Sequence, residues 1–135
     1  ITYGDWSSDV CSSDLMQETY KDVTSGINAN LKDLRTQIPD VLTAFSQLSR
    51  AATADGVLDK KTKEFIALAL GVASHCDGCI GFHTQALARL GATREEVAEV
   101  LGMAVYMGGG PSLMYAADAR QAFEEAMETS TAKAN

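Results

Sequence analysis

The feature that most restricts the fold is a run of nine residues without a polar side chain, from Phe65 to Ala73. Asp59 is a candidate N-cap just upstream, so the run is predicted to lie within an α-helix. A helix that is apolar on every side must be covered on every side, and nine residues are too few to span a bilayer. The cover is therefore expected to be protein, namely the core of the chain itself together with another subunit.

A cysteine pair follows this run. We expect a second helix from about Asp77 to Leu90, with Gly91 as its C-terminal stop. Both thiols of the Cys-x-x-Cys motif, Cys76 and Cys79, then lie in or just before the first turn. The free amides and the positive end of the helix dipole stabilise a thiolate there. Cys76, Cys79 and His83 are spaced i, i+3 and i+7 and so share one stripe of the helix.

Four interpretations of the thiol pair can be compared. A thiol pair with a proton carrier nearby is what a cycling disulfide needs. As a structural staple the pair is poor, because so short a loop contributes only roughly 2 kcal/mol. A structural zinc site needs four ligands, and beyond the pair the candidates are His83, His75, Glu64 and the distant Cys11. The pattern favours redox chemistry, with a zinc site or inert buried thiols as alternatives.

Glu64 and His83 are the candidate proton carriers. Glu64 opens the apolar run, so we expect its carboxyl group to be partly desolvated and ready to exchange protons near neutral pH. The alternative is an exposed glutamate in a first helical turn, stabilised by the helix dipole. His83 lies one turn beyond Cys79, which favours a functional role. His75 lies at the bend outside this stripe, and no role is assigned to it.

The combination resembles a known signature. Glu64, eleven residues, Cys76-x-x-Cys79, three residues and His83 are similar to the pattern of the alkylhydroperoxidase D-like proteins within the carboxymuconolactone decarboxylase superfamily. The likeness covers roughly residues 39–126, most of the chain. The further segments that resemble the short single-domain members are Lys61 to Glu64, His75 to Ile80, Phe82 to Thr84, Gly91 to Glu96 and Met107 to Pro111.

The resemblance implies a fold and an activity. The implied fold is an all-α, compact helical domain that assembles through apolar helices into a homo-trimer or homo-hexamer. The implied activity is that of a thiol-dependent hydroperoxide reductase without a cofactor or metal. Cys79 would attack the peroxide, Cys76 would resolve the sulfenic acid, and Glu64 and His83 would relay protons. A partner dithiol, such as a lipoylated protein, would then reduce the disulfide.

Two differences within the superfamily bear on this implication. The characterised peroxidase is longer and has a histidine immediately before its second cysteine, where this chain has Gly78. The decarboxylases that give the superfamily its name lack the cysteine pair, so the two thiols argue against decarboxylation here. The rival functions are a decarboxylase or other lyase that uses Glu64 and His83, and a redox-sensing or zinc-binding module.

Length and charge limit the number of domains and the classes of binding partner. A chain of 135 residues is predicted to be one domain, near the size at which association is useful. Its net charge is −7, with no clustered Lys or Arg face, which argues against nucleic-acid binding. No signal peptide or membrane segment is recognised, and a single Cys-x-x-Cys pair fits a reducing compartment, so a cytoplasmic location is predicted.

Residues 1–15 differ from the rest of the chain. They repeat Ser-Ser-Asp, lack an amphipathic period and hold three aspartates but no basic residue. The segment resembles a translated sequencing adapter, so we predict that it is a non-native leader and that the native chain begins at Met16. The helical domain is then predicted to occupy residues 16–127.

The rest of this domain reads as helices joined by short turns. A polar helix is expected from about residue 18 to 34, and another restarts at Pro39. Thr93 and Glu96 form a capping box, and the helix after them has an apolar arc wide enough to predict a subunit contact. A final helix is expected to end near residue 127, followed by a disordered tail over residues 128–135.

Overall fold

The computed structural model of the chain describes residues 18–135; the predicted leader, residues 1–15, lies outside this range. Over the described residues the chain is all-α, as predicted, with six helices and no strand. The helices are α1 (Tyr20–Gln37), α2 (Pro39–Thr53), α3 (Lys60–Ala73), α4 (Asp77–Arg89), α5 (Arg94–Gly108) and α6 (Gly110–Ala134).

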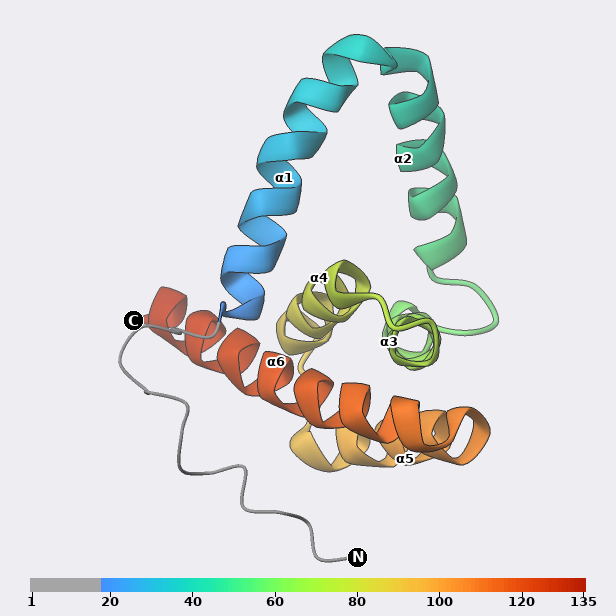
Figure 1. The fold of residues 1–135 in the computed structure, drawn as a ribbon, viewed down its shortest axis with the longest axis vertical. Helices are drawn as coiled ribbons and strands as arrows, with labels where there is room; N and C mark the ends of the chain where they lie inside the picture. Colours follow the sequence, from blue (N-terminus) through green and yellow to red (C-terminus); the bar gives the residue numbers. More distant parts are fainter. Residues whose placement is uncertain (1–17) are drawn as a thin grey trace, which may run out of the picture.

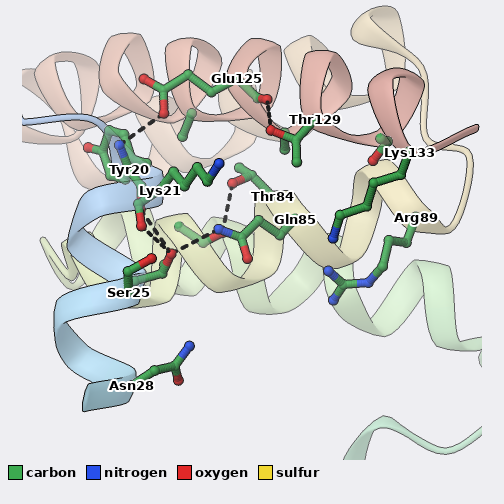
Figure 2. Close-up of a pocket in the computed structure, with 15 residues that line it drawn as sticks. Tyr20, Lys21, Ser25, Asn28, Thr84, Gln85, Arg89, Glu125, Thr129 and Lys133 are labelled. Carbon is green, nitrogen blue, oxygen red and sulfur yellow. Dashed lines mark hydrogen bonds between the residues drawn. The ribbon is translucent and has the colours of Figure 1, made fainter. Parts of the chain in front are cut away.

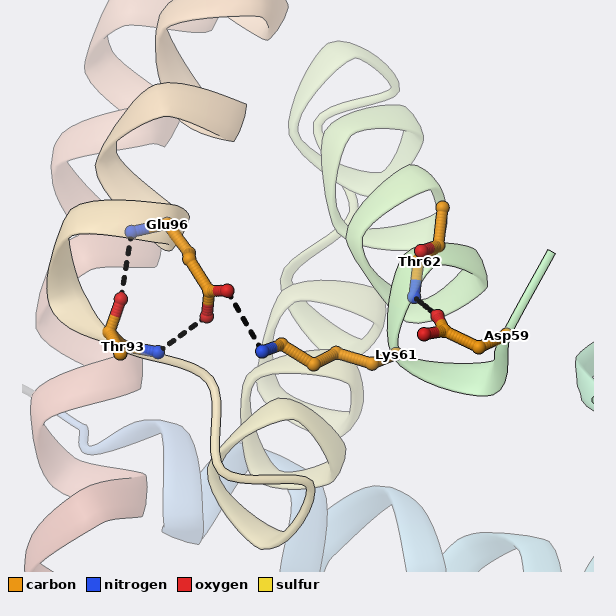
Figure 3. A network of polar contacts seen from close by, with 5 residues as sticks. All are labelled: Asp59, Lys61, Thr62, Thr93 and Glu96. Carbon is orange, nitrogen blue, oxygen red and sulfur yellow. Dashed lines mark hydrogen bonds and ion pairs between the residues drawn. The ribbon is translucent and has the colours of Figure 1, made fainter.

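Local capping signals set the start of α3 and α5, and they also join the two helices. The Asp59 carboxylate accepts a hydrogen bond from the Thr62 backbone amide at 2.7 Å. Thr93 and Glu96 form the expected capping box at the start of α5. The Glu96 carboxylate also binds the Lys61 ammonium at 2.8 Å, so the first turns of α3 and α5 are linked (Figure 3). Glu64 lies one turn into α3, so these contacts help to fix its position.

The core is made by the four C-terminal helices. In Figure 1, α5 and α6 lie side by side, and α3 and α4 pack on the same side of that pair. Small residues in α6 let its neighbours approach closely, and Phe123 fills the remaining space. The buried apolar side chains are Leu68, Val72, Ile80, Leu87, Ala92, Val97, Leu101, Ala104, Ala116, Ala119, Ala122, Phe123 and Ala126.

Helices α1 and α2 form an arm that projects from this body (Figure 1). The first turns of α1 pack against α4 and α6, and Thr24 is its one buried residue. Helix α2 has no buried residue and, within residues 18–135, contacts only α1 and α3. The apolar face of α2 is therefore left largely exposed within the described residues.

The C-terminal segment differs from the prediction. Residues 128–135 were expected to be disordered, but α6 continues to Ala134. The start of α1 packs beside the last turns of α6, and the Tyr20 amide donates to the Glu125 carboxylate at 2.9 Å. Thr129 and Ser130 are partly shielded where they face α1. Composition did not reveal this contact, because it depends on the tertiary position of α1.

Candidate functional site

The cysteine pair lies where α3 ends and α4 begins. The chain turns sharply there, with hydrogen bonds from His75 N to Val72 O and from Cys76 N to Gly71 O. Cys76 is the N-cap of α4, and its sulfur accepts a hydrogen bond from the Cys79 backbone amide at 3.2 Å. The two cysteines form a disulfide with their Cα atoms 5.2 Å apart. The predicted helix start therefore holds both sulfurs next to free amides and the positive end of a helix dipole.

Glu64 and His83 meet between α3 and α4. The Glu64 carboxylate lies 2.6 Å from Nδ1 of His83, and Glu64 is only 5 % exposed. Since a buried carboxyl needs a hydrogen-bond partner, His83 satisfies Glu64 and is itself held in one orientation. The alternative of a solvent-exposed Glu64 is therefore wrong. His83 stays half-buried, one turn after Cys79 on α4.

A glycine in α3 lets the two helices of the site come together. A Cβ atom on Gly71 would lie 3.0 Å from Cys79 Cβ, closer than about nine in ten real Cβ contacts. The absence of a side chain at Gly71 therefore allows α4 to place Cys79 directly against α3, the helix that carries Glu64. Its position inside an apolar helical run is the sequence signal of such a close backbone approach.

We expect Gly71→Ala to destabilise the protein by about 1–3 kcal/mol, as overpacking of a tight core contact does. The substitution should also slow any chemistry that needs α3 and α4 in register. Gly26→Ala is the matched control, because a Cβ at Gly26 meets no atom within 4 Å. It should instead stabilise α1 by about 0.5–1 kcal/mol. Chemical denaturation of both variants at one fixed protein concentration measures the difference, and equal stabilities would contradict the packing argument.

Helix α1 covers Gly78, the position at which the characterised alkylhydroperoxidase D-like peroxidase has a histidine before its second cysteine. A Cβ atom on Gly78 would lie 2.7 Å from Cδ1 of Ile27 in α1. A histidine at this position would therefore have to displace the end of the Ile27 side chain. The lack of a side chain at Gly78 thus leaves room for Ile27 of the arm. His83 is the one histidine in α4.

A tyrosine from the arm reaches the start of α4. The Tyr20 hydroxyl donates a long hydrogen bond of 3.5 Å to the Asp77 carboxylate, next to Cys76. Burial raises the pKa of Tyr20 well above its usual value, and the negative charges of Asp118 and Asp77 raise it further. Tyr20 therefore remains a neutral hydrogen-bond donor through the physiological pH range. This anchor between α1 and α4 was not predicted from the sequence, because it joins residues far apart in the chain.

Comparison with known proteins identifies the family. Residues 39–122 match the model of the carboxymuconolactone decarboxylase family, and this match covers more than half of the chain. The chain belongs to the carboxymuconolactone decarboxylase family. This confirms the resemblance at the level of the superfamily, and the described helices agree with it.

Solved structures and curated sequences agree with this assignment. A carboxymuconolactone decarboxylase family protein from Legionella pneumophila, solved as the apo protein, is 60% identical with a TM-score of 0.78, covering 80% of this chain and 96% of that one. A Thermotoga maritima structure is 29% identical with a TM-score of 0.66, covering 74% of this chain and 91% of that one. An uncharacterized Cupriavidus necator protein is 45% identical, covering 73% of this chain and 87% of its own length.

In this carboxymuconolactone decarboxylase family member, the four predicted site residues lie on two adjoining helices. Glu64 belongs to α3, Cys79 and His83 belong to α4, and Cys76 caps α4. The fold therefore brings Glu64 into contact with His83, which lies one helical turn beyond Cys79 of the disulfide. Among residues 18–135, no three His, Cys, Asp or Glu side chains are grouped to hold a metal ion. The same range contains no helix long and apolar enough to cross a membrane.

A separate cavity of about 260 Å³ lies between α1, α4 and α6 (Figure 2). It is on the other side of α4 from the Glu64 contact, and neither motif cysteine lines it. Its wall includes Thr84 and Gln85, and Gln85 donates to Thr24 of α1 at 3.0 Å. The Gln85–Thr24 and Tyr20–Asp77 hydrogen bonds hold α1 on α4. The cavity therefore lies where the arm meets the four-helix core.

Proposed function

We propose that this protein is a thiol-dependent hydroperoxide reductase that cycles through the Cys76–Cys79 disulfide. The observation that supports the proposal most is that His83, one helical turn after Cys79 of the disulfide, contacts the buried carboxylate of Glu64 at 2.6 Å. A purely structural disulfide gains little from so short a loop and needs no proton carrier. A cycling one needs both a nucleophilic thiolate and a route for its proton.

The proposed first step oxidises Cys79. With the Glu64 carboxylate accepting a hydrogen bond from His83 Nδ1–H, the second ring nitrogen of His83 is free to take the thiol proton. The Cys79 thiolate attacks one oxygen of the hydroperoxide, so that an S–O bond forms and the O–O bond breaks. The leaving alkoxide takes the proton from His83 and departs as an alcohol. Cys79 is then a sulfenic acid, and the peroxide has been reduced by two electrons.

The proposed second step forms the disulfide. Cys76 loses its proton and attacks the sulfur of the Cys79 sulfenic acid, so that an S–S bond forms and the S–O bond breaks. The departing hydroxide takes up the proton and leaves as water. In the disulfide form the Cys76 sulfur accepts a hydrogen bond from the Cys79 amide, which supports a position for Cys76 at the start of α4 beside Cys79.

A partner dithiol completes the proposed cycle. It attacks the disulfide, passes through a mixed disulfide and leaves both cysteines reduced while it becomes oxidised itself. A lipoylated protein is the reductant that fits the resemblance to alkylhydroperoxidase D-like proteins. Steady-state consumption of a hydroperoxide in the presence of dihydrolipoamide tests the full cycle. We expect continuous turnover with this dithiol and a single turnover without it; the absence of any dithiol-dependent consumption would contradict the proposed cycle.

We also propose that the protein works as a homo-oligomer, a trimer or hexamer. Val41, Phe45 and Leu48 form an apolar stripe along α2, and Phe45 is 66% exposed in the single chain. Leu70 of α3 and Met107 of α5 are exposed too, at 62% and 76%. Large apolar side chains exposed on several helices are typical of subunit interfaces. The apolar run of α3 and the wide apolar arc of α5 were predicted to make subunit contacts. The stripe on α2 was not predicted, because its spacing is that of a core-facing helix.

Native mass spectrometry at micromolar concentration is expected to give a closed oligomer of three or more chains. Replacing Phe45 and Leu48 together with Asp should shift the population to smaller species, because two charges would be buried in the interface. Gln47→Asp is the matched control, since it adds a charge to the same helix outside the stripe. A stable wild-type monomer would contradict the assignment of these surfaces.

A further inference from the structure

His75 has a backbone conformation that favours glycine. Its φ is 55°, and among residues 18–135 it is the one residue other than glycine with a positive φ. The hydrogen bonds from His75 N to Val72 O and from Cys76 N to Gly71 O form the pair that defines a Schellman turn at a helix end. Glycine is usual at the left-handed position of that turn, because a side chain there is strained. The turn alone therefore gives no reason for an imidazole.

The imidazole has a specific partner in α6. The rings of His75 and Tyr115 are stacked, with centroids 4.6 Å apart and planes 7° from parallel. Tyr115 is itself partly buried against the hydrophobic core. Stacked aromatic rings attract each other beyond the burial of their area, so this contact offsets the backbone strain at His75. It also ties the turn between α3 and α4 to a third helix.

This turn carries one of the two sulfurs. Cys76 is the residue after His75 and caps α4, whose first turn contains Cys79. When the disulfide is reduced, the position of Cys76 depends on the turn and on whatever holds the turn in place. A turn tied to α6 restricts the Cys76 sulfur to the neighbourhood of Cys79, which raises its effective concentration for bond formation.

We propose that His75 is a positioning residue of the disulfide cycle, acting by stacking on Tyr115 to hold Cys76 ready to attack Cys79. The inference rests on the proposed function and adds a residue to it. The step concerned is disulfide closure, in which the Cys76–Cys79 bond forms, the S–O bond of the sulfenic acid breaks, and hydroxide leaves and becomes water. The stack carries this role, so Tyr115 is needed as much as His75.

The test separates the two oxidation steps in variants that keep the turn but lose the ring. His75→Gly and His75→Asn both accept a positive φ, and Tyr115→Leu removes the other half of the stack. Rapid quenching with a reagent that traps sulfenic acid measures its formation and its decay to the disulfide. We expect formation to be unchanged and closure to slow by about tenfold in all three variants, within the loss that a misplacement of about 1 Å can cause.

The control and the stability measurement decide between positioning and general structure. Tyr115→Phe keeps a stacking ring, so it should close the disulfide at the wild-type rate. His75→Gly should change the thermal midpoint little, because the relief of backbone strain offsets the loss of the stack. Unchanged closure in His75→Gly and His75→Asn would overturn the proposal, as would closure rates that merely follow the thermal midpoints of the variants.

A second readout needs no hydroperoxide. In glutathione redox buffers, loss of the stack should shift the Cys76–Cys79 equilibrium toward the dithiol by about tenfold in the equilibrium constant, since it lowers the effective concentration of Cys76. If reduced wild-type protein failed to react with hydroperoxides but this shift were seen, the positioning role would stand and the peroxidase proposal would fail. An unshifted equilibrium in the ringless variants would contradict the positioning role itself.

Discussion

Cys79→Ser is expected to abolish hydroperoxide turnover, whereas Cys76→Ser should leave one oxidation event per chain without cycling. The reason is that Cys79 supplies the attacking thiolate and Cys76 is needed only for closure of the disulfide. Turnover is measured as hydroperoxide consumption with excess dithiol, and the single event as one equivalent of trapped sulfenic acid. Cys11→Ser is the matched control and should behave as the wild type in both assays.

The same substitutions distinguish the rival functions. A lyase that used Glu64 and His83 would tolerate both cysteine substitutions and fail when either proton carrier is removed. A zinc module would contain stoichiometric metal and lose folding stability without either cysteine. Wild-type hydroperoxide consumption by Cys79→Ser would refute the assignment of Cys79 as the attacking residue.

Glu64→Gln should slow the reaction of Cys79 with hydroperoxide at neutral pH by about 10²–10⁴, the contribution expected of a general base, because His83 acts as the base only with the Glu64 charge beside it. Glutamine still fills the buried space and can accept a hydrogen bond from His83, but it carries no charge to stabilise the imidazolium that forms. The deficit should shrink at alkaline pH, where the thiol ionises without help. The measurement is the pH profile of the rate of thiol loss in the reduced protein.

A matched control is available on α5. Glu99→Gln removes an exposed carboxylate outside the α3–α4 site and should leave the pH profile unchanged. If Glu64→Gln and Glu99→Gln gave the same profile as the wild type, the buried contact between Glu64 and His83 would have no part in proton transfer.

The local part of this fold could be predicted from the sequence because its signals are local. Asp59 caps α3, Thr93 and Glu96 cap α5, and Gly91 takes the left-handed conformation after α4, as their positions predicted. The stripe of Cys76, Cys79 and His83 follows from helical spacing alone. Glu64 was singled out because it opens the apolar run, but its contact with His83 joins two helices and does not follow from the period of either one.

The features that were missed depend on tertiary contacts. The left-handed residue of the turn is His75 and not the usual glycine, so the sequence did not mark the turn. The stack of His75 on Tyr115, which offsets the strain, joins residues far apart in the chain. The stripe on α2 has the pattern of a core-facing helix, yet its side chains stay largely exposed within residues 18–135. The helical end of α6 depends on the neighbouring start of α1, which the polar composition of residues 128–135 does not reveal.

Anaerobic stopped-flow measurement on the fully reduced protein tests the central claim most directly. Mixed with one equivalent of hydroperoxide, the chain should lose two of its three thiols as the Cys76–Cys79 disulfide forms. The reaction with at least one of several hydroperoxides should be much faster than that of reduced glutathione under the same conditions, because Glu64 and His83 activate Cys79. A protein with both motif thiols reduced that reacts with every hydroperoxide no faster than glutathione would contradict the account.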